Sequence, residues 1–413
     1  MQDSTITNKG GSELLHKLLM GWVAIYLIGL VSSKAILGIG MVGLAVAALA
    51  YGSRQSWDGA RVKPFLFPVI IFLITLLSGL HSEDLAMWSQ FIAKKAPFLV
   101  LPIAFYLARD HFAKHFYDYL LGFVVIVGVV ALGVIVNYLM NFDNLNKAIG
   151  RGQAISTPID HAEFSIYIAY AAICSLFMYY EDKRVVRIGS KSTLLLTAIF
   201  LTIALHILAV RSGLAVFYSV LLLIGGFHFY RQRKYKLLLA LLVGIFIFPM
   251  IAIKTIPSLN KKMSYAKWDI NQYKKGKGLS YSDSERLFSL EAGWSVFKSA
   301  PIIGVGVGDL KSKCQEAYAA RNYPELQHYP HNQYLFVLAA MGIIGFILYS
   351  IALLGPLWFM RGSYDPYFIS LHAVLFISAL VENTLERTFS IGFYLFFVLL
   401  SLSYLTKKWD QQK

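Results

Sequence analysis

The chain has 413 residues, of which 57% are hydrophobic and only 15% are charged, and its formal net charge is +15. Soluble domains carry about 25% charged residues, so this composition excludes an ordinary soluble protein and favours an integral membrane protein. The excess of Lys and Arg is typical of the cytoplasmic loops of membrane proteins and does not by itself indicate nucleic-acid binding.

The first segment, "MQDSTITNKGGSELLHK", lacks the features of a cleaved signal peptide, because its basic residues are sparse and no small-residue cleavage site follows the first apolar run. A membrane-spanning helix needs about 20 mostly apolar residues, and the chain contains about twelve runs of this kind. They lie near residues 16–33, 35–51, 64–80, 90–108, 116–141, 161–180, 193–210, 212–230, 236–253, 331–354, 366–381 and 388–405. The sequence therefore predicts an all-α integral membrane protein.

Two of these runs have unusual features. Lys94, Lys95, Pro97 and Pro102 interrupt the fourth run, which makes its course the least certain. The run at 212–230 follows its predecessor almost without a linker, which predicts a tight turn at residues 211–213.

The orientation follows from where Lys and Arg gather. They are concentrated in the short loops that would be cytoplasmic if both termini lay inside, notably in "EDKRVVRIGSK" and "RQRKYK". This predicts three parts: helices 1–9 in residues 1–253, a long external loop at 254–330, and helices 10–12 in 331–413. Long loops translocate regardless of their charge, so the basic character of this loop does not contradict the orientation.

Several residues near the outer face are candidates for chemistry. Arg211 falls at the outer turn between the seventh and eighth helices, where an arginine is either an interface anchor or part of a site. Arg286 falls in the first turn of a short helix predicted by the capping-box pattern Ser282-x-x-Glu285. A cation there opposes the helix dipole, which indicates another role, although a structural salt bridge remains an alternative. The apolar face predicted for this helix consists of Leu287, Leu290, Trp294 and Phe297.

Two further stretches look like motifs. "GVGVGD" (residues 304–309) lacks the strand before it that a dinucleotide site requires, so we interpret it as a turn. "YPHNQYLFVLAAMGIIG" places His331 and Asn332 at the start of the tenth span, after a proline suited to a helix N-terminus. At about 1.5 Å per residue, Gly342 lies about 16 Å further along the helix, near mid-membrane, where it and Gly345 would let another helix approach closely.

The spacing His-Asn, nine residues, then Gly-Ile-Ile-Gly resembles the signature of the bacterial O-antigen ligases and of their relatives, the O-antigen polymerases and protein O-oligosaccharyltransferases. "SERLFSLEAGWSVFKSAPIIGVGVG" and the "VRSG" turn are similar to two further patches of that family. The resemblance implies a GT-C-like fold of about twelve helices, with one long periplasmic loop that contains short helices.

The resemblance also implies an activity: inverting transfer of an O-antigen polysaccharide from undecaprenyl pyrophosphate to a sugar of the lipid A–core. His331 would be the general base, since an acceptor hydroxyl needs one. Arg211 and Arg286, with Lys95, would bind the pyrophosphate, and Asn332, Gly342 and Gly345 would support them. Nearby residues at the same face form a second set of candidates, in which Asp160 or His161 could replace the histidine as base: Arg151, Asp160 and His161.

No His, Cys or carboxylate pattern in the outer loop indicates a metal site, so we expect transfer without metal and without a cofactor. The expected location is the inner membrane of a Gram-negative bacterium, with the site facing the periplasm. The alternatives are a polymerase or protein O-oligosaccharyltransferase of the same superfamily. Outside that class stands a transporter of lipid-linked glycans, for which internal repeats would be expected.

Overall fold

A computed structural model gives the arrangement of the chain and describes residues 3–52, 58–181, 191–275, 282–321, 323–360 and 365–410. The first ten helices are α1 (Asp3–Leu30), α2 (Lys34–Gly52), α3 (Gly59–Leu66), α4 (Val69–Leu77), α5 (Leu85–Lys95), α6 (Pro97–Leu107), α7 (Arg109–Lys114), α8 (Phe116–Met140), α9 (Phe142–Ile149) and α10 (His161–Glu181). The next ten are α11 (Lys191–Leu208), α12 (Arg211–Val220), α13 (Gly226–Arg231), α14 (Tyr235–Thr255), α15 (Pro257–Lys274), α16 (Ser282–Ser299), α17 (Leu310–Ala319), α18 (Gln333–Phe359), α19 (Pro366–Val381) and α20 (Thr388–Asp410). Over these residues the chain contains no strand, and the all-α membrane fold is confirmed.

Ten helices of the described chain are long and apolar enough to cross a membrane. The pair α3 and α4 adds an eleventh if it counts as one span, although it is bent by 56°. The bend falls at Pro68, which precedes α4 and lacks the N–H group that a continuous helix would use. Helix α19 is apolar but has only 16 residues. The expected count of twelve spans is reached only if the bent pair α3–α4 and the short helix α19 are each counted as a span.

The degree of enclosure separates central helices from peripheral ones. Every side chain of α10 from Ala162 to Ser175 is buried, and so is every side chain of α20 from Ile391 to Ser403. Helix α14, in contrast, buries only Ala252 and exposes large apolar side chains such as Phe246 and Met250. A contiguous exposed apolar surface of this kind is stable in lipid rather than in water.

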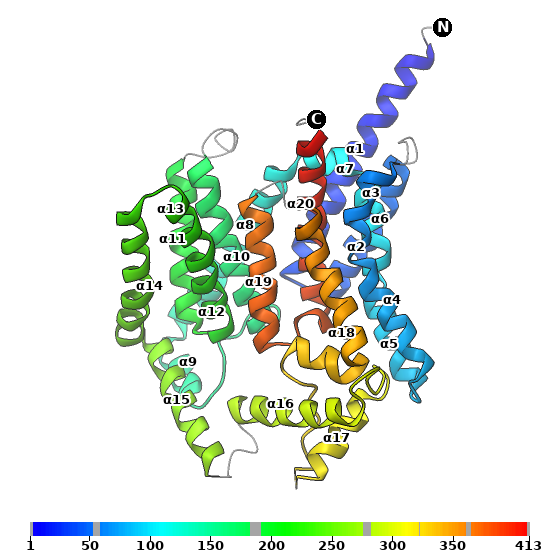
Figure 1. Ribbon diagram of the computed structural model, residues 1–413. Helices are drawn as coiled ribbons and strands as arrows, with labels where there is room; N and C mark the ends of the chain where they lie inside the picture. Colours follow the sequence, from blue (N-terminus) through cyan, green and yellow to red (C-terminus); the bar gives the residue numbers. More distant parts are fainter. Residues whose placement is uncertain are drawn as a thin grey trace.

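Different helices lie at the two ends of the bundle (Figure 1). The beginning of α1 and the end of α20 lie together at one end, and α15, α16 and α17 lie at the other, where α16 runs across the bundle. The described part of residues 257–330 therefore contains α15, α16 and α17, gathered at the end that is remote from both termini.

Two local expectations are wrong. The tight turn predicted at residues 211–213 lies earlier, because α11 ends at Leu208 and α12 begins at Arg211. Ala209 makes the turn with a positive φ of 54°, and Val210 is extended. Arg211 is thus the first residue of α12 and not part of the turn.

The predicted α16 helix exists, but its buried face differs from the expected one. The buried residues, all of them small or medium in size except Phe288, are Asp283, Ser284, Phe288, Ser289, Ala292, Gly293 and Val296. Trp294, expected on a face that lies on the bundle or on the membrane, is 50% exposed and so does not pack inside the bundle. Small side chains let α16 pack closely on the start of α18, where an added Cβ on Gly293 would lie 2.5 Å from Pro330. Close packing, and not the bulk of the apolar residues, sets the orientation of this helix.

Candidate functional site

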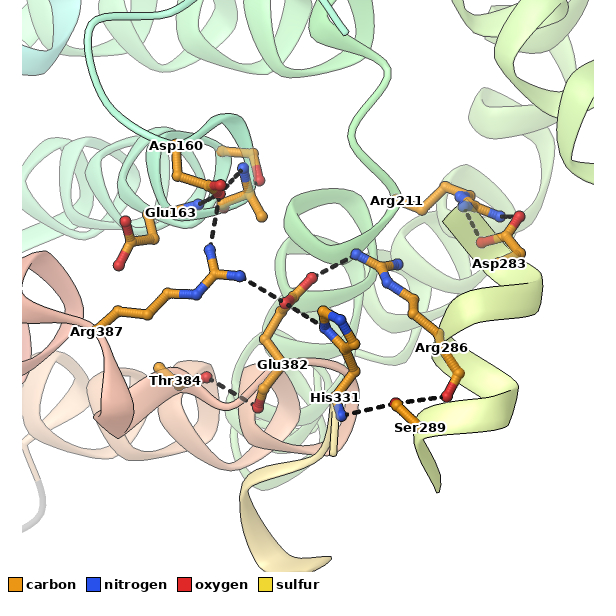
Figure 2. A network of polar contacts seen from close by, with 12 residues as sticks. Asp160, Glu163, Arg211, Asp283, Arg286, Ser289, His331, Glu382, Thr384 and Arg387 are labelled. Carbon is orange, nitrogen blue, oxygen red and sulfur yellow. Dashed lines mark hydrogen bonds and ion pairs between the residues drawn. The ribbon is translucent and has the colours of Figure 1, made fainter. Parts of the chain in front are cut away.

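A single buried carboxylate, Glu382, lies at the centre of the candidate site (Figure 2). It follows α19 directly, and its backbone N–H donates to the carbonyl of Ser378 at the end of that helix. Arg286 of α16 donates to Glu382 Oε1 at 2.5 Å, and Arg387 donates to Oε2 at 3.4 Å. His331 Nδ1 lies 3.6 Å from Oε2, an ion-pair distance longer than a hydrogen bond. Three segments far apart in the chain therefore meet at one carboxylate.

The accessibility of these groups differs between the acid and its basic partners. The side chain of Glu382 is 4% exposed, whereas those of Arg286, Arg387 and His331 are 22–30% exposed. Burial disfavours the charge on Glu382, but its three basic neighbours outweigh burial and hold its pKa below the ordinary value. The carboxylate lies behind, and the cationic groups face the accessible side. An anionic ligand approaching this site meets the guanidinium groups first.

A second arginine–carboxylate pair lies beside the first. Both terminal nitrogens of Arg211 donate to Asp283, a bidentate pair. Here too the arginine is the more accessible partner, at 30% against 11% exposure. Helix α15 holds this pair in place, because Asp269 accepts from the backbone N–H of Asp283 and from Ser284 Oγ. Asp269 thus satisfies donors at the start of α16 from a neighbouring helix. The side chain of Ser282, on which the capping-box expectation rests, lies outside the described residues.

A lysine that the sequence did not single out adds to this charge. Lys262 of α15 donates to the carbonyl of Gly152 at 2.9 Å. Burial lowers the pKa of Lys262, and the positive charges of Arg211 and Arg286 lower it further. The charges of Asp283 and Asp269 raise the pKa of Lys262 in opposition to the arginines, so Lys262 lies among the charged groups of the candidate site.

The start of α18 orients His331 and Asn332. The backbone N–H of His331 donates to Ser289 Oγ at 3.0 Å, and that hydroxyl donates to the carbonyl of Arg286. Asn332 caps α18 by accepting from the N–H of Leu335, while its amide donates to the carbonyl of Leu380. The His-Asn pair therefore joins α16, α18 and the end of α19, which places the imidazole next to Glu382.

Gly342 breaks α18 instead of lying in a straight helix. Its φ is +64° with ψ at −168°, a conformation that residues with a side chain rarely adopt. The distance expected between His331 and mid-membrane assumed a straight helix, so it does not apply. An added Cβ would lie 2.3 Å from the carbonyl group of Ile302, so the neighbour that approaches Gly342 is a backbone turn and not a second helix. The corresponding Cβ on Gly345 would meet Met341 of the same helix.

Backbone hydrogen bonds fix this turn to α18 on both sides of the break. The N–H groups of Val305 and Gly306 donate to the carbonyls of Ala339 and Ala340. Beyond Gly342, the N–H groups of Ile343 and Ile344 donate to the carbonyls of residues 301 and 302. Gly304 and Gly306 have positive φ values of 74° and 87°. The "GVGVGD" stretch is thus a turn, as expected, and it ends where Asp309 accepts from the backbone N–H groups of residues 83 and 84.

Lys95 lies in a buried network behind the turn that carries Glu382 and Arg387. Its ammonium group donates to Glu386 Oε1 at 2.8 Å and to the carbonyl of Leu385, and its side chain is 2% exposed. Gln333 of α18 donates to the same Glu386 oxygen and accepts from the N–H of Leu385. In this arrangement Lys95 supports residues 385–386 and has no accessible surface for a ligand.

Asp160, His161 and Arg151 lie at the same end of the bundle. Asp160 Oδ1 accepts from the N–H of Ala162 at the start of α10 and pairs with Arg387 at 3.0 Å. Burial favours the protonated acid, but Arg387, His161 and the N–H groups at the start of α10 outweigh it, so the pKa of Asp160 is lowered. Arg151 lines a neighbouring pocket of about 680 Å³ with basic and aromatic walls, together with Asn146, Lys147, Gly150, Lys261, Ser264, Tyr265 and Trp268.

The residues that sequence reasoning missed are Glu382, Arg387 and Lys262. One signal was present: "VENTLER" places three charges in a short link between two apolar runs, where a simple turn needs none. No comparable signal marked Lys262, which is one of several lysines in α15.

Together, the fold and this cluster define a multi-pass helical membrane protein with an acid-anchored cationic site at one end of the bundle. Residues 195–350 match the family model described as O-antigen ligase. This match supports the O-antigen ligase family and, with it, the glycosyl transfer of the O-antigen ligase and polymerase superfamily. No curated protein matches the chain. The matched region includes Arg211, Arg286 and His331, whereas Glu382 and Arg387 lie beyond it.

Proposed function

We propose that the protein transfers an O-antigen polysaccharide from undecaprenyl pyrophosphate to a sugar hydroxyl of the lipid A–core, with inversion and without a metal ion, at the periplasmic face of the bacterial inner membrane. The family supports glycosyl transfer and partners of this general kind. One observation carries the finer assignment: a histidine and two arginines share the buried carboxylate of Glu382.

In this proposal His331 is the general base. Its Nδ1 is buried and lies toward Glu382, which leaves Nε2 as the nitrogen for proton transfer. The acceptor oxygen attacks the anomeric carbon, the bond from that carbon to the pyrophosphate oxygen breaks, and the hydroxyl proton passes to Nε2. Glu382 then stabilises the imidazolium that forms, as a carboxylate does in other histidine dyads. Attack opposite the leaving group inverts the anomeric centre.

Arg211 and Arg286 are proposed to bind the pyrophosphate. Their accessible guanidinium groups are pre-oriented by Asp283 and Glu382, so little reorganisation is needed as negative charge develops on the leaving group. Lys262 adds positive charge nearby. Cations fixed in this way supply the charge stabilisation that a divalent ion provides in other enzymes.

The alternatives for the base and for the donor site are less well supported by the geometry. Asp160 accepts two helix N–H groups and pairs with Arg387, and its lowered pKa makes it a weak acceptor for a hydroxyl proton. Lys95 is enclosed by its own ion pair. The pocket beside Arg151 is proposed to take the acceptor, because basic and aromatic walls suit a phosphorylated sugar.

The test is transfer by the purified full chain in detergent, with EDTA, lipid-pyrophosphate-linked glycan and lipid A–core. We expect product from the wild type and a loss of about 10²- to 10⁴-fold for His331→Ala. His328→Ala is the matched control, because its ring centroid lies 6.0 Å from that of His331 and its side chain is 44% exposed.

Each outcome has a defined meaning. Equal product from the wild type and His331→Ala would remove His331 as the base and favour Asp160 or His161. Longer glycans formed from the donor alone would favour the polymerase alternative, and transfer to a Ser or Thr peptide would favour the protein O-oligosaccharyltransferase.

A further inference from the structure

Three histidines gather at the end of the bundle that is remote from Glu382. His16 lies in α1, His111 in α7, and His115 between α7 and α8. Each offers one ring nitrogen, and these three atoms all lie within 4.8 Å of one another. His111 and His115 are four residues apart on a helical turn, which places both rings on one side, facing α1. Figure 1 shows α7 beside α1, near the end of α20.

The other contacts of the rings determine which nitrogens face inward. His115 Nδ1 contacts Asp118 Oδ2 at 2.8 Å, and its Nε2 is buried without a hydrogen-bond partner. His111 Nε2 contacts the hydroxyl of Tyr119 at 2.5 Å. His111 Nδ1 lies 2.9 Å from His16 Nδ1. In His111 and in His115, one ring nitrogen contacts a polar group outside the cluster. The other ring nitrogen therefore lies toward the centre of the three histidines.

This is the arrangement that metal-binding histidines have in proteins. A ligating imidazole donates its second N–H to a carboxylate or another acceptor, which fixes the tautomer and the ring orientation. Asp118 and Tyr119 provide such acceptors for His115 and His111. Without a metal ion, His115 Nε2 is buried and has no hydrogen-bond partner. A metal ion would bind this nitrogen together with Nδ1 of His111 and Nδ1 of His16, which face each other.

We propose that His16, His111 and His115 bind one divalent metal ion of the class that prefers imidazole, with Zn²⁺ as the reference ion. Three nitrogen ligands and a water complete a tetrahedral site, and hard ions such as Mg²⁺ and Ca²⁺ are excluded because they prefer oxygen ligands. Nitrogens around zinc lie about 3.4 Å apart, so small side-chain rotations close the present spacing. The ion fastens α1 to α7 and α8, which gives it a structural role.

This site is separate from the proposed transfer chemistry. It lies at the opposite end of the bundle from His331 and Glu382, so its ion does not contact the reacting groups (Figure 1). The proposal therefore stands or fails independently of the proposed function, and metal content and thermal stability test it without an activity assay.

The experiment uses the full chain in detergent, purified without a polyhistidine tag. The protein is stripped with a chelator, dialysed against Zn²⁺ and then against metal-free buffer, and its zinc is measured by mass spectrometry. We expect about one zinc per chain for the wild type. We expect none for His16→Ala or His115→Ala, and the wild-type amount for the control His228→Ala, whose imidazole lies elsewhere against Gln232. Co²⁺ in place of zinc is expected to give the visible absorption of a tetrahedral site in the wild type only.

Asp118→Asn keeps all three ligands, so it tests the geometry even if the ligand variants fold poorly. We expect it to bind zinc about 10- to 100-fold more weakly than the wild type. Added zinc is also expected to raise the melting temperature of the wild type but not that of His115→Ala. Zinc content in the wild type no higher than in His16→Ala and His115→Ala, or a Co²⁺ spectrum typical of octahedral coordination, would overturn the proposal.

Discussion

Individual residues show how one buried carboxylate can organise several basic groups. Glu382 is almost fully enclosed and contacts Arg286, Arg387 and His331. Removing one partner from a buried pair costs more than the pair contributes, because an uncompensated charge remains. The partial exposure of the two arginines lowers that cost through solvent screening. Glu382 therefore influences both stability and the orientation of the histidine.

We expect Glu382→Gln to lower transfer by about 10²-fold, because the imidazolium loses its carboxylate partner. We expect Glu382→Asp to recover part of that loss, which a purely structural role would not require. The measurement is the initial rate of transfer as a function of pH. A Glu382→Gln enzyme with an unchanged rate and pH profile would contradict the dyad.

The stability of the protein is also expected to depend on this group. The pKa of Glu382 is lowered in the folded protein, so its ionised form contributes stability above the unfolded pKa of about 4.3. That contribution is lost as the pH falls through the lower folded pKa. The melting-temperature difference between wild type and Glu382→Gln should therefore be largest near neutral pH and should shrink below pH of about 4.

Lys95 is expected to act on stability and not on donor binding. We expect Lys95→Met to destabilise the protein by about 3 kcal/mol, since Glu386 would be left buried without its cation. The double variant Lys95→Met/Glu386→Gln should restore most of this loss, as measured by thermal unfolding in detergent. A rise in KM for the lipid-pyrophosphate donor in a fully stable Lys95→Met protein would instead support a direct role at the pyrophosphate.

At the scale of elements, the break in α18 is a feature that the sequence pattern of the helix did not predict. Residues 333–359 form one continuous apolar run, and such a run does not distinguish a straight helix from a broken one. The break arises from the turn at residues 301–306, which supplies backbone partners on both sides of Gly342. The start of the helix was expected at Pro330, but α18 begins at Gln333 with Asn332 as its N-cap. The shape of the helix was not predictable, because its cause lies in another segment.

Gly342→Ala should therefore destabilise the protein by about 2–4 kcal/mol, since it combines a positive φ with a Cβ placed against Ile302. Gly133→Ala in α8 is the matched control, because an added Cβ there meets nothing within 4 Å. Its melting temperature should be unchanged or slightly higher. Equal melting temperatures for the two variants would contradict the observed conformation at Gly342.

At the scale of the whole molecule, the sequence predicted the fold class but only part of the site. Apolar runs identify spans because lipid requires them, and the arginines and the histidine belonged to a recognisable pattern. The carboxylates that pair with these residues were not part of that pattern, since Glu382 and Arg286 are 96 positions apart in the chain. Pairing over such distances depends on the packing of α16 against α18 and of α18 against α19, which no local sequence pattern encodes.

The proposed orientation predicts which end of the bundle is accessible from the periplasm. In a chain with Cys174→Ser and Cys314→Ser, we expect Lys274→Cys in α15 to react with a membrane-impermeant maleimide when only the outer membrane is permeabilised. Lys407→Cys in α20 should react only after lysis. Both positions are exposed, so access across the membrane alone distinguishes them. Reversed labelling would place the candidate site on the cytoplasmic side.

The backbone contacts around Gly342 make the turn at residues 301–306 tolerant of changes in its side chains. Residues 301–306 are fixed to α18 by main-chain groups, and Asp309 anchors the far end of the turn to backbone N–H groups at residues 83 and 84. Main-chain partners are present whatever the side chains are. The turn therefore keeps its contacts with α18 when its side chains change, except at Gly304 and Gly306, whose positive φ favours glycine. The geometry of this turn and the chemistry of its side chains are in this way separable.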